Sequence, residues 1–313
     1  MKNLVYILLL TSVVGLTNCS DDTSKNPFET PSALKRIEYL STDGQIITPT
    51  SPNGFGARII SNIYNGELGT IEFESAVTAI GYRAFTNCTT LRGIIIPDKV
   101  RDIEEYSFLG CNNLVEVNIP KNVTEIGDGA FAYCDNLAAF YGKFSSEDNR
   151  CLVVNLSVDA FAPAGLTSYT IPYGVREIGG SCFEGCKELA SISLPSTITE
   201  IDDRAFAFCI SLESITIPAG ITEVSSSTFE GCSALNKVML PASINEIDAL
   251  AFKNCNTLQN IYCAATTPPR IAANSFENIA ASAVIYVPIN SVTAYQNAAN
   301  WSSYASQIVG YEF

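Results

Sequence analysis

The feature that most constrains this chain is a repeat with a period of 23 that runs through its middle. Three residue types recur in one phase, mostly at intervals of 23: a proline that follows Ile or Leu, a phenylalanine and a cysteine. Because so short a unit cannot close a hydrophobic core alone, successive units must stack on one another. The positions are Pro97, Pro120, Pro172, Pro195, Pro218 and Pro241; Phe85, Phe108, Phe131, Phe183, Phe206, Phe229, Phe252 and Phe276; and Cys88, Cys111, Cys134, Cys186, Cys209, Cys232 and Cys255.

Each unit also contains a strand pattern. The end of one unit joined to the start of the next reads Leu212-x-x-Ile215-x-Ile217-Pro218, which is the L-x-x-L-x-L pattern of a leucine-rich repeat. The sequence therefore predicts a leucine-rich-repeat solenoid of about nine rungs of 23 residues and one of 29. Short parallel strands line one side, loops and turns form the convex side, and the phenylalanines stack inside.

One interval of 52 interrupts the series and equals one repeat of 23 plus one of 29. Leu137 is followed in the same frame by Leu166, so residues 140–168 form one long repeat. The extra residues fit a loop at 145–150. We expect a tolerated surface excursion, because lengthening a loop costs little free energy; a functional insertion is the alternative.

Open solenoid ends need caps. Residues 34–70 are expected to form an N-terminal cap, in which segments 35–40 and 45–48 flank the turn signal Asp43-Gly44 as a hairpin. The solenoid should span 71–282 and a C-terminal cap 283–313. In that second cap we expect a strand at 283–288, a helix at 291–299 with Asn290 or Ser291 as N-cap, and Trp301 and 308–313 packed over the last rung.

The N-terminus resembles an export signal. Residues 1–18 have a basic start and an apolar stretch too short to span a bilayer, which is typical of a signal peptide. They lead to Leu16-Thr17-Asn18-Cys19, which resembles a bacterial lipobox apart from Asn18, so we predict lipidation of Cys19 and a flexible tether at 19–33. Asp21 and Asp22 resemble a surface-export signal, which implies anchorage to the outer membrane at the cell surface. The alternative is a soluble exported protein.

Composition limits the function. The formal net charge of −14 repels nucleic acid and anionic lipid headgroups, so membrane contact is expected only through the anchor. The chain has no histidine, which excludes Ser-His and Cys-His catalysis and His-ligated metal. Nucleotide-binding loops, G-x-S-x-G and H-E-x-x-H are absent as well. We therefore predict a protein that is not an enzyme and has no cofactor and no metal centre; paired glutamates remain a weak alternative, because the repeat itself produces them.

The cysteines are expected to be reduced. Seven share one repeat phase, which corresponds to the Asn/Cys position of leucine-rich repeats, so they should behave as small buried hydrophobes. Of the others, Cys182 replaces the alanine before a phenylalanine and is expected in the core, while Cys151 and Cys263 have no assigned role.

Two surface columns follow from the repeat. The acidic column should be a solvated face that discourages edge-to-edge association, with a calcium row or a docking strip for basic partners as the alternative; it comprises Asp102, Glu125, Glu177, Glu200, Glu223 and Glu246. The outward positions of the main strands should line a concave binding face, with an anchor near Met239 and Tyr262. They are Ile95, Asn118, Thr170, Ser193, Thr216, Met239 and Tyr262.

The full unit, I-x-I-P-x-x-V-x-x-I-x-x-x-A-F-x-x-C-x-x-L, resembles the BspA-like leucine-rich-repeat family over roughly residues 35–313. The resemblance implies a surface or secreted protein, and some members are adhesins that bind host matrix or serum glycoproteins. We therefore predict a monomeric binding or adhesion module for an extracellular protein or glycoprotein of unknown identity. The alternatives are a glycan-handling accessory lipoprotein, which the single tryptophan disfavours, and a structural envelope protein.

Overall fold

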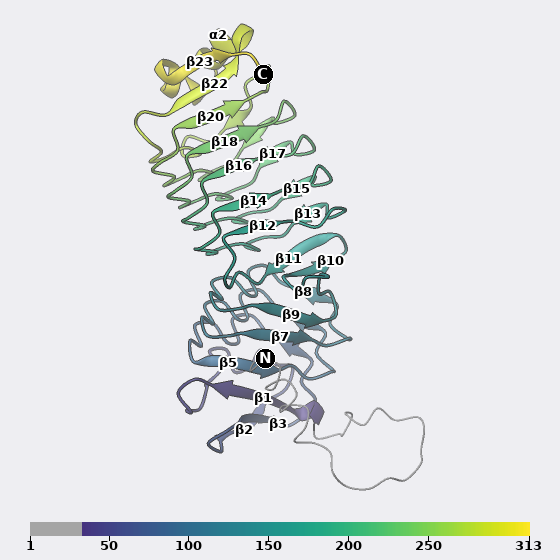
Figure 1. Cartoon of the computed structure of the whole chain (residues 1–313). Helices are drawn as coiled ribbons and strands as arrows, with labels where there is room; N and C mark the ends of the chain where they lie inside the picture. The colour runs from purple at the N-terminus through teal and green to yellow at the C-terminus, as the bar shows by residue number, and fades with distance from the viewer. Residues whose placement is uncertain (1–32) are drawn as a thin grey trace.

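The computed structural model describes residues 33–313 and shows an elongated stack of rungs (Figure 1). Most rungs contribute one main strand to one side of the stack and one two-residue lateral strand. Main strands of successive rungs pair in parallel, as in Thr216 opposite Met239 and Met239 opposite Tyr262. The predicted leucine-rich-repeat solenoid of about ten turns is therefore confirmed. The main strands are β5 (Leu91–Ile95), β7 (Glu116–Ile119), β9 (Ala139–Gly142), β12 (Ser168–Thr170), β14 (Ser191–Ser193), β16 (Ser214–Thr216), β18 (Lys237–Leu240), β20 (Asn260–Cys263) and β22 (Val284–Pro288).

The lateral strands form shorter parallel sheets beside the main sheet. Their outward positions are polar, apart from Ala79 in β4, and their inward positions are buried aliphatics, which gives the period of two that a half-buried strand requires. They are β4 (Ala79–Ile80), β6 (Asp102–Ile103), β8 (Glu125–Ile126), β13 (Glu177–Ile178), β15 (Glu200–Ile201), β17 (Glu223–Val224), β19 (Glu246–Ile247) and β21 (Arg270–Ile271).

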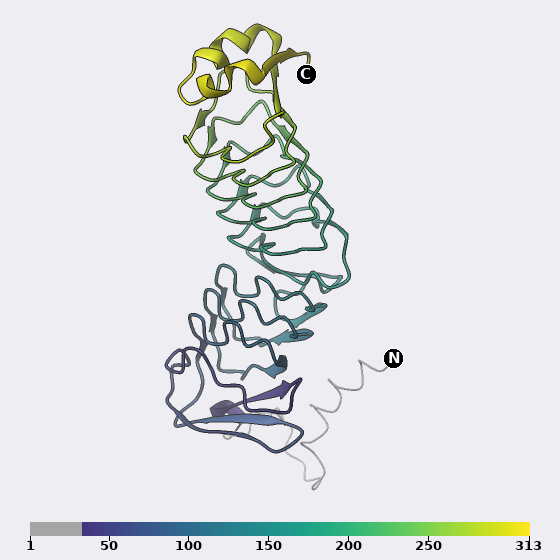
Figure 2. The same cartoon turned by 90° about the vertical axis from the view of Figure 1, so that its left-hand side faces the viewer.

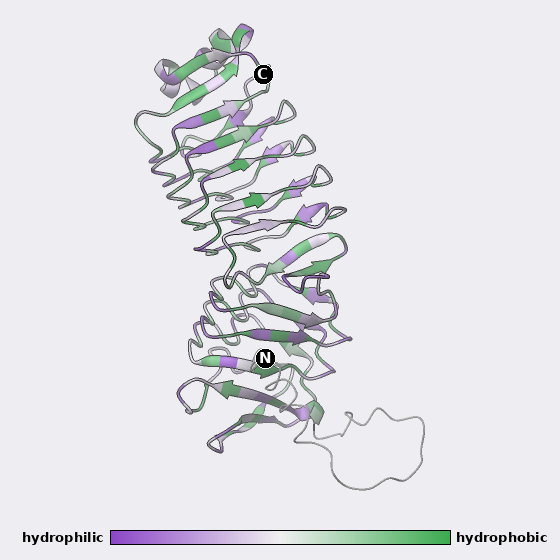
Figure 3. Ribbon diagram, viewed as in Figure 1, coloured by the Kyte–Doolittle hydropathy of each residue, from purple (hydrophilic) through white to green (hydrophobic). Residues whose placement is uncertain are grey.

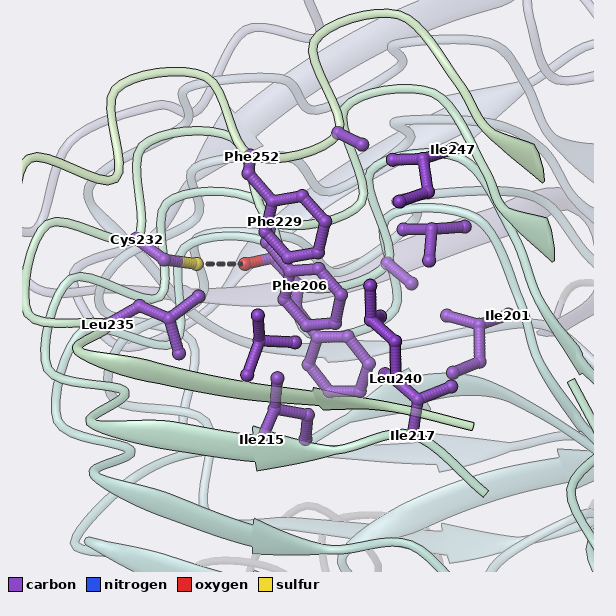
Figure 4. Packing of buried hydrophobic residues seen from close by; sticks show 14 of the residues in the cluster. Ile201, Phe206, Ile215, Ile217, Phe229, Cys232, Leu235, Leu240, Ile247 and Phe252 are labelled. Carbon is purple, nitrogen blue, oxygen red and sulfur yellow. Dashed lines mark hydrogen bonds between the residues drawn. The ribbon is translucent and has the colours of Figure 1, made fainter. Parts of the chain in front are cut away.

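The phenylalanines form the predicted interior column. From Phe183 to Phe276, and again from Phe85 to Phe131, successive rings stack with centroids 5.0–5.5 Å apart and interplanar angles of 4–15°. Figure 4 shows Phe206, Phe229 and Phe252 in one such row between the aliphatic side chains of the two strands. Burial of each ring stabilises the stack by about 1.5–3 kcal/mol.

The cysteines lie beside this column as free thiols. Five of them donate a hydrogen bond to the main-chain carbonyl of the phenylalanine one rung earlier, at 3.1–3.2 Å. The bond from Cys232 to Phe206 is drawn in Figure 4. Each of these carbonyls also accepts the main-chain N–H of the cysteine three residues later, as Phe206 O does from Cys209 N, so the thiol adds a second hydrogen bond that joins one rung to the next.

The long repeat contains the expected surface turn and, in addition, a hairpin that the sequence analysis did not predict. Its extra residues form an antiparallel hairpin of β10 (Cys151–Val154) and β11 (Ser157–Phe161), and Cys151 and Leu152 are fully buried. The turn at 145–150 remains at the surface. Strand β11 takes the lateral place in its rung, because it pairs in parallel with β13.

The hairpin divides the stack into two parts, each with its own buried cluster (Figures 1 and 2). The main sheet is interrupted between β9 and β12, and the lateral sheet between β8 and β10. The strand pairing is also interrupted one rung pair later, between β14 and β16 and between β15 and β17, but there the buried cluster is continuous. The convex turns nevertheless continue across this joint: Gly129 N donates to Gly180 O (3.1 Å) and Tyr133 N to Glu184 O (3.2 Å). The two parts therefore remain joined along one side of the stack.

The N-terminal cap differs from the predicted hairpin. After η1 (Ala33–Lys35), β1 (Arg36–Ser41) pairs antiparallel with both β3 (Gly69–Phe73) and β5, while β2 (Ile59–Tyr64) pairs with β3. Residues 45–48 form no strand, because Ile47 is held by side chains: its N–H donates to the Tyr39 hydroxyl and its carbonyl accepts from Asn62. Strand β3 carries the cap to Phe73, beyond the expected limit at 70.

The C-terminal cap agrees with its predicted strand and helix. Strand β22 is followed by η2 (Ile289–Ser291), α2 (Val292–Asn297), η3 (Trp301–Gln307) and β23 (Ile308–Tyr311), and these helices close the end of the stack (Figure 2). Trp301 is fully buried, and its ring centroid lies 5.8 Å from that of Phe276. Ser291 occupies the N-cap position of α2, but its hydroxyl donates to Thr266 O rather than capping the helix.

Candidate functional site

The acidic column lies on the lateral strands, whose outward positions are hydrophilic in Figure 3. It is not one continuous row. The register brings its members together as three separate pairs: Asp102 with Glu125, Glu177 with Glu200, and Glu223 with Glu246. The long repeat and the break between β15 and β17 separate the pairs.

The ends of the column also differ from a row of carboxylates. Ser157 stands in it beside Glu177, and Arg270 ends it with an ion pair to Glu246. Within residues 33–313, no three or more Asp, Glu, Cys or His side chains are grouped so that they could hold a metal ion. The arrangement therefore gives no support to the alternative of a calcium row.

Carboxylates also gather at the joint between the two parts of the stack. Burial, together with the charges of Glu177, Asp128 and Asp202, raises the pKa of Asp159 to about 7. Burial and neighbouring carboxylates likewise raise the pKa of Asp202 to about 6 and that of Asp128 above its ordinary value. Gly180 leaves room for this cluster, because a Cβ there would lie 2.6 Å from Asp128 Oδ2.

The predicted concave-face residues lie on the outward side of the main sheet, which we call the main-sheet face. Asn118 lies on β7, Thr170 opposite Ser193, and Thr216, Met239 and Tyr262 in consecutive register. In the C-terminal part this face is rich in serine and threonine side chains, becomes more apolar from Met239 onward, and ends in aromatic rings. Its outward residues are Ser168, Thr170, Ser191, Ser193, Ser214, Thr216, Lys237, Met239, Asn260, Tyr262, Val284, Tyr286, Val309 and Tyr311.

The aromatic end of this face is larger than the sequence indicated. Tyr286 stacks on Tyr262 with ring centroids 4.4 Å apart and an interplanar angle of 11°. Tyr311 stands roughly perpendicular to both rings, at 5.2 and 5.7 Å, and Phe313 contacts Tyr311 at 5.1 Å. We call these four residues the tyrosine cluster. Lys237 Nζ lies over the ring of Tyr262, 5.1 Å from its centroid.

Sequence reasoning found only Tyr262 in this cluster, because we assigned everything after residue 282 to the cap. The signal for Tyr286 was available: it follows Tyr262 by one repeat plus one position, in the same strand phase. Tyr311 and Phe313 follow a helical segment and have no place in the repeat, so only the pairing of β23 with β22 reveals them.

Stacked rungs with short parallel strands define a leucine-rich-repeat solenoid, a class that generally consists of binding modules. The model of the BspA-type leucine-rich repeat region matches residues 52–147 and 154–303 in six copies, and the chain belongs to this family. Its members are typically associated with the bacterial surface. No curated protein matches the sequence.

Solved structures of similar proteins are also bacterial. A leucine-rich cell surface protein from Faecalibacterium prausnitzii shares 30% identity over 59% of this chain and 57% of its own, with a TM-score of 0.49. The leucine-rich repeat protein of T. pallidum shares 26% identity over 54% of this chain and 68% of its own, with a TM-score of 0.34. This chain thus spans little more than half of the first of these proteins. Family membership rests on the family model, because both TM-scores are below 0.5.

The predicted signal peptide, lipidation site at Cys19 and tether lie outside the described residues, except for residue 33. Among residues 33–313, none of the helices has the length and apolar character needed to span a bilayer.

Proposed function

We propose that this protein is a non-enzymatic binding module, anchored through lipidated Cys19 at the cell surface, whose main-sheet face binds an extracellular protein. The observation that carries the proposal is the chemistry of that face in the C-terminal part. Hydroxyl and amide side chains lead to a rigid group of tyrosines, and antibody paratopes use the same residue types. Serine and asparagine offer adaptable hydrogen bonds, and tyrosine offers contact area at low entropic cost.

The packing of the tyrosines favours a protein ligand over a glycan. Sugars stack on the open face of an aromatic ring. The ring of Tyr262 is not free on its own, because Tyr286 stacks on it and Lys237 Nζ lies over it, 5.1 Å from its centroid. Trp301, the only tryptophan, is buried in the cap. These observations support adhesion to a protein rather than the alternative of glycan handling.

The test is a binding assay of the full chain against purified matrix and serum glycoproteins and against polysaccharides, near physiological salt, with and without calcium. Thr216→Arg places a long charged side chain on the main-sheet face, and we expect it to weaken binding of a protein ligand about tenfold or more. Thr222→Arg is the matched control, because Thr222 is also exposed in the same rung but lies beside the lateral strand. Binding to polysaccharides alone, or to no ligand at all, would contradict the proposal.

A further inference from the structure

We infer that the tyrosine cluster, together with Lys237, binds an extended polypeptide segment that presents an acidic residue beside apolar side chains. The inference rests on the proposed function, since it names the chemistry of the ligand at one end of the same face. It is carried by three observations on the described residues: exposed apolar area, ring orientation and charge.

Exposed apolar side chains gather around the tyrosine cluster. Val309, Tyr311 and Phe313 are 46%, 42% and 53% exposed, and the half-exposed Tyr262 and Tyr286 adjoin them. Exposed apolar patches of this kind mark interaction sites, and tyrosine is enriched where proteins meet. Apolar side chains of a partner would lie on this surface.

The ring orientation favours a polypeptide. Because Tyr262 and Tyr286 stack along the solenoid, they present ring edges and hydroxyls, rather than ring faces, to a ligand on the main-sheet face. A phenol hydroxyl can donate to a peptide carbonyl, and an extended segment offers such carbonyls at regular intervals. Tyr311 stands beside the stack and extends the same surface.

The charge of the main-sheet face favours a ligand that carries an acidic residue. The protein carries a formal net charge of −14, yet the main strands from β12 to β23 contain no Asp or Glu, and Lys237 is their only charged residue. Within residues 33–313, Lys237 is exposed and makes no ion pair; its contact is with the Tyr262 ring. The exposed Glu312, between Tyr311 and Phe313, follows β23, which is separated from β18 by two strands. A carboxylate of the partner can therefore approach at the β18 side of the cluster and pair with Lys237, whereas the lateral face would repel it.

The experiment selects a random-peptide library against the full chain and measures the affinity of the enriched peptides for variants. We expect peptides that combine an Asp or Glu with apolar residues. Tyr262→Ser with Tyr311→Ser should weaken their binding about tenfold or more, and the control Tyr173→Ser, at a tyrosine 82% exposed and outside the cluster, should not. Lys237→Gln should weaken binding about threefold to tenfold and reduce its salt dependence. The control Lys253→Gln, which removes an ion pair with Glu277 elsewhere, should change neither.

Several outcomes would overturn the inference. Enriched peptides without an acidic residue, or an unchanged affinity in Lys237→Gln, would exclude the charge pairing. Peptides that bind equally well to the Tyr262→Ser, Tyr311→Ser double variant would show that the protein binds elsewhere, which removes the inference but leaves the proposed function intact. Cluster-dependent binding on a parallel glycan array would assign the site to sugars. If no peptide is enriched, the inference fails, and the assay with Thr216→Arg decides the proposed function separately.

Discussion

At the scale of single residues, the thiols of the cysteine column are held by both hydrogen bonding and burial. Burial raises the pKa of Cys111 and Cys232 well above the ordinary thiol value, and neighbouring thiols raise it further. Thiolate is the reactive form, so these side chains should be chemically inert in the folded protein. Cys88, in the first rung, is the only half-buried cysteine among the described residues.

This difference predicts the order of thiol modification. With an alkylating reagent at mildly alkaline pH, we expect Cys88 to react first and the other described cysteines only when their rungs open. Mass spectrometry of peptides over a time course measures the order, and labelling in denaturant controls for reagent access. Early modification of Cys232 would contradict the hydrogen-bonded, buried arrangement.

At the scale of the element, each rung turns on its convex side through residues with positive φ. Large side chains and glycines pack together there: the Tyr133 ring lies over Gly185, and the Phe208 ring over Gly231. A Cβ on Gly231 would lie 2.6 Å from Phe208 Cδ1, and the φ of +72° favours glycine as well. The glycine of one rung thus makes room for the ring of the rung before it.

We therefore expect Gly231→Ala to lower the free energy of unfolding by about 2–4 kcal/mol, from backbone strain and overpacking together. Gly165→Ala is the control, because Gly165 has the same φ of +72° but no atom near the added Cβ, so it should cost only about 1–2 kcal/mol. Chemical denaturation measures both. The addition of Phe208→Ala should reduce the penalty of Gly231→Ala, and equal costs for the two glycine variants would show that the ring does not restrict the site.

Most of the stack could be predicted from the sequence because its signal recurs. Main strands, buried phenylalanines and the cysteine column each appear once in almost every repeat, so an error in one rung would have been visible against the others. The β10–β11 hairpin occurs once and has no such support. Its signal was present, since residues 151–161 alternate in part and turn at Asn155 and Leu156, both with positive φ.

In the caps and the candidate site as well, features in the repeat phase could be predicted and features outside it could not. Strand β22 and Tyr262 lie in the repeat phase and were found. The partners of β1 could not be predicted, because both β3 and β5 lie far along the chain from it. Alternation within a strand does not specify a distant neighbour. Tyr311 was missed for the same reason, because it reaches the cluster through the pairing of β22 with β23, a strand that follows a helical segment.

At the scale of the whole molecule, the joint between the two parts contains carboxylates with raised pKa values. Because the folded-state pKa of Asp159, about 7, lies above its ordinary value of 3.8, the native protein takes up a proton before the unfolded chain does. The contribution of Asp159 to stability therefore improves as the pH falls from about 8 toward about 5 and worsens as it rises.

We predict that Asp159→Asn stabilises the protein near pH 8 by an amount on the order of 2 kcal/mol, and that this gain shrinks toward about pH 5. Thermal unfolding across this pH range measures both proteins. Asp43→Asn is a control of opposite sign, because the Ser41 hydroxyl and the Gln45 N–H lower the pKa of Asp43, so its ionised form favours the folded state. A gain for Asp159→Asn that does not depend on pH would mean that the carboxylate is not responsible.

The uniform hydrogen bonding between neighbouring rungs also bears on how the gene can change. Phe206 N donates to Thr228 O, and Phe229 N donates to Ala251 O, so the convex turn of each rung offers its neighbours the same hydrogen bonds. An in-frame loss of residues 198–220 would bring Ile221 to the place of Ile198 and leave the contacts on both sides equivalent. Unequal recombination between repeats can therefore shorten or lengthen the molecule one rung at a time, about 5 Å per step, without the evolution of a new interface. Across the hairpin, where the contacts are not interchangeable, the same event would break the fold.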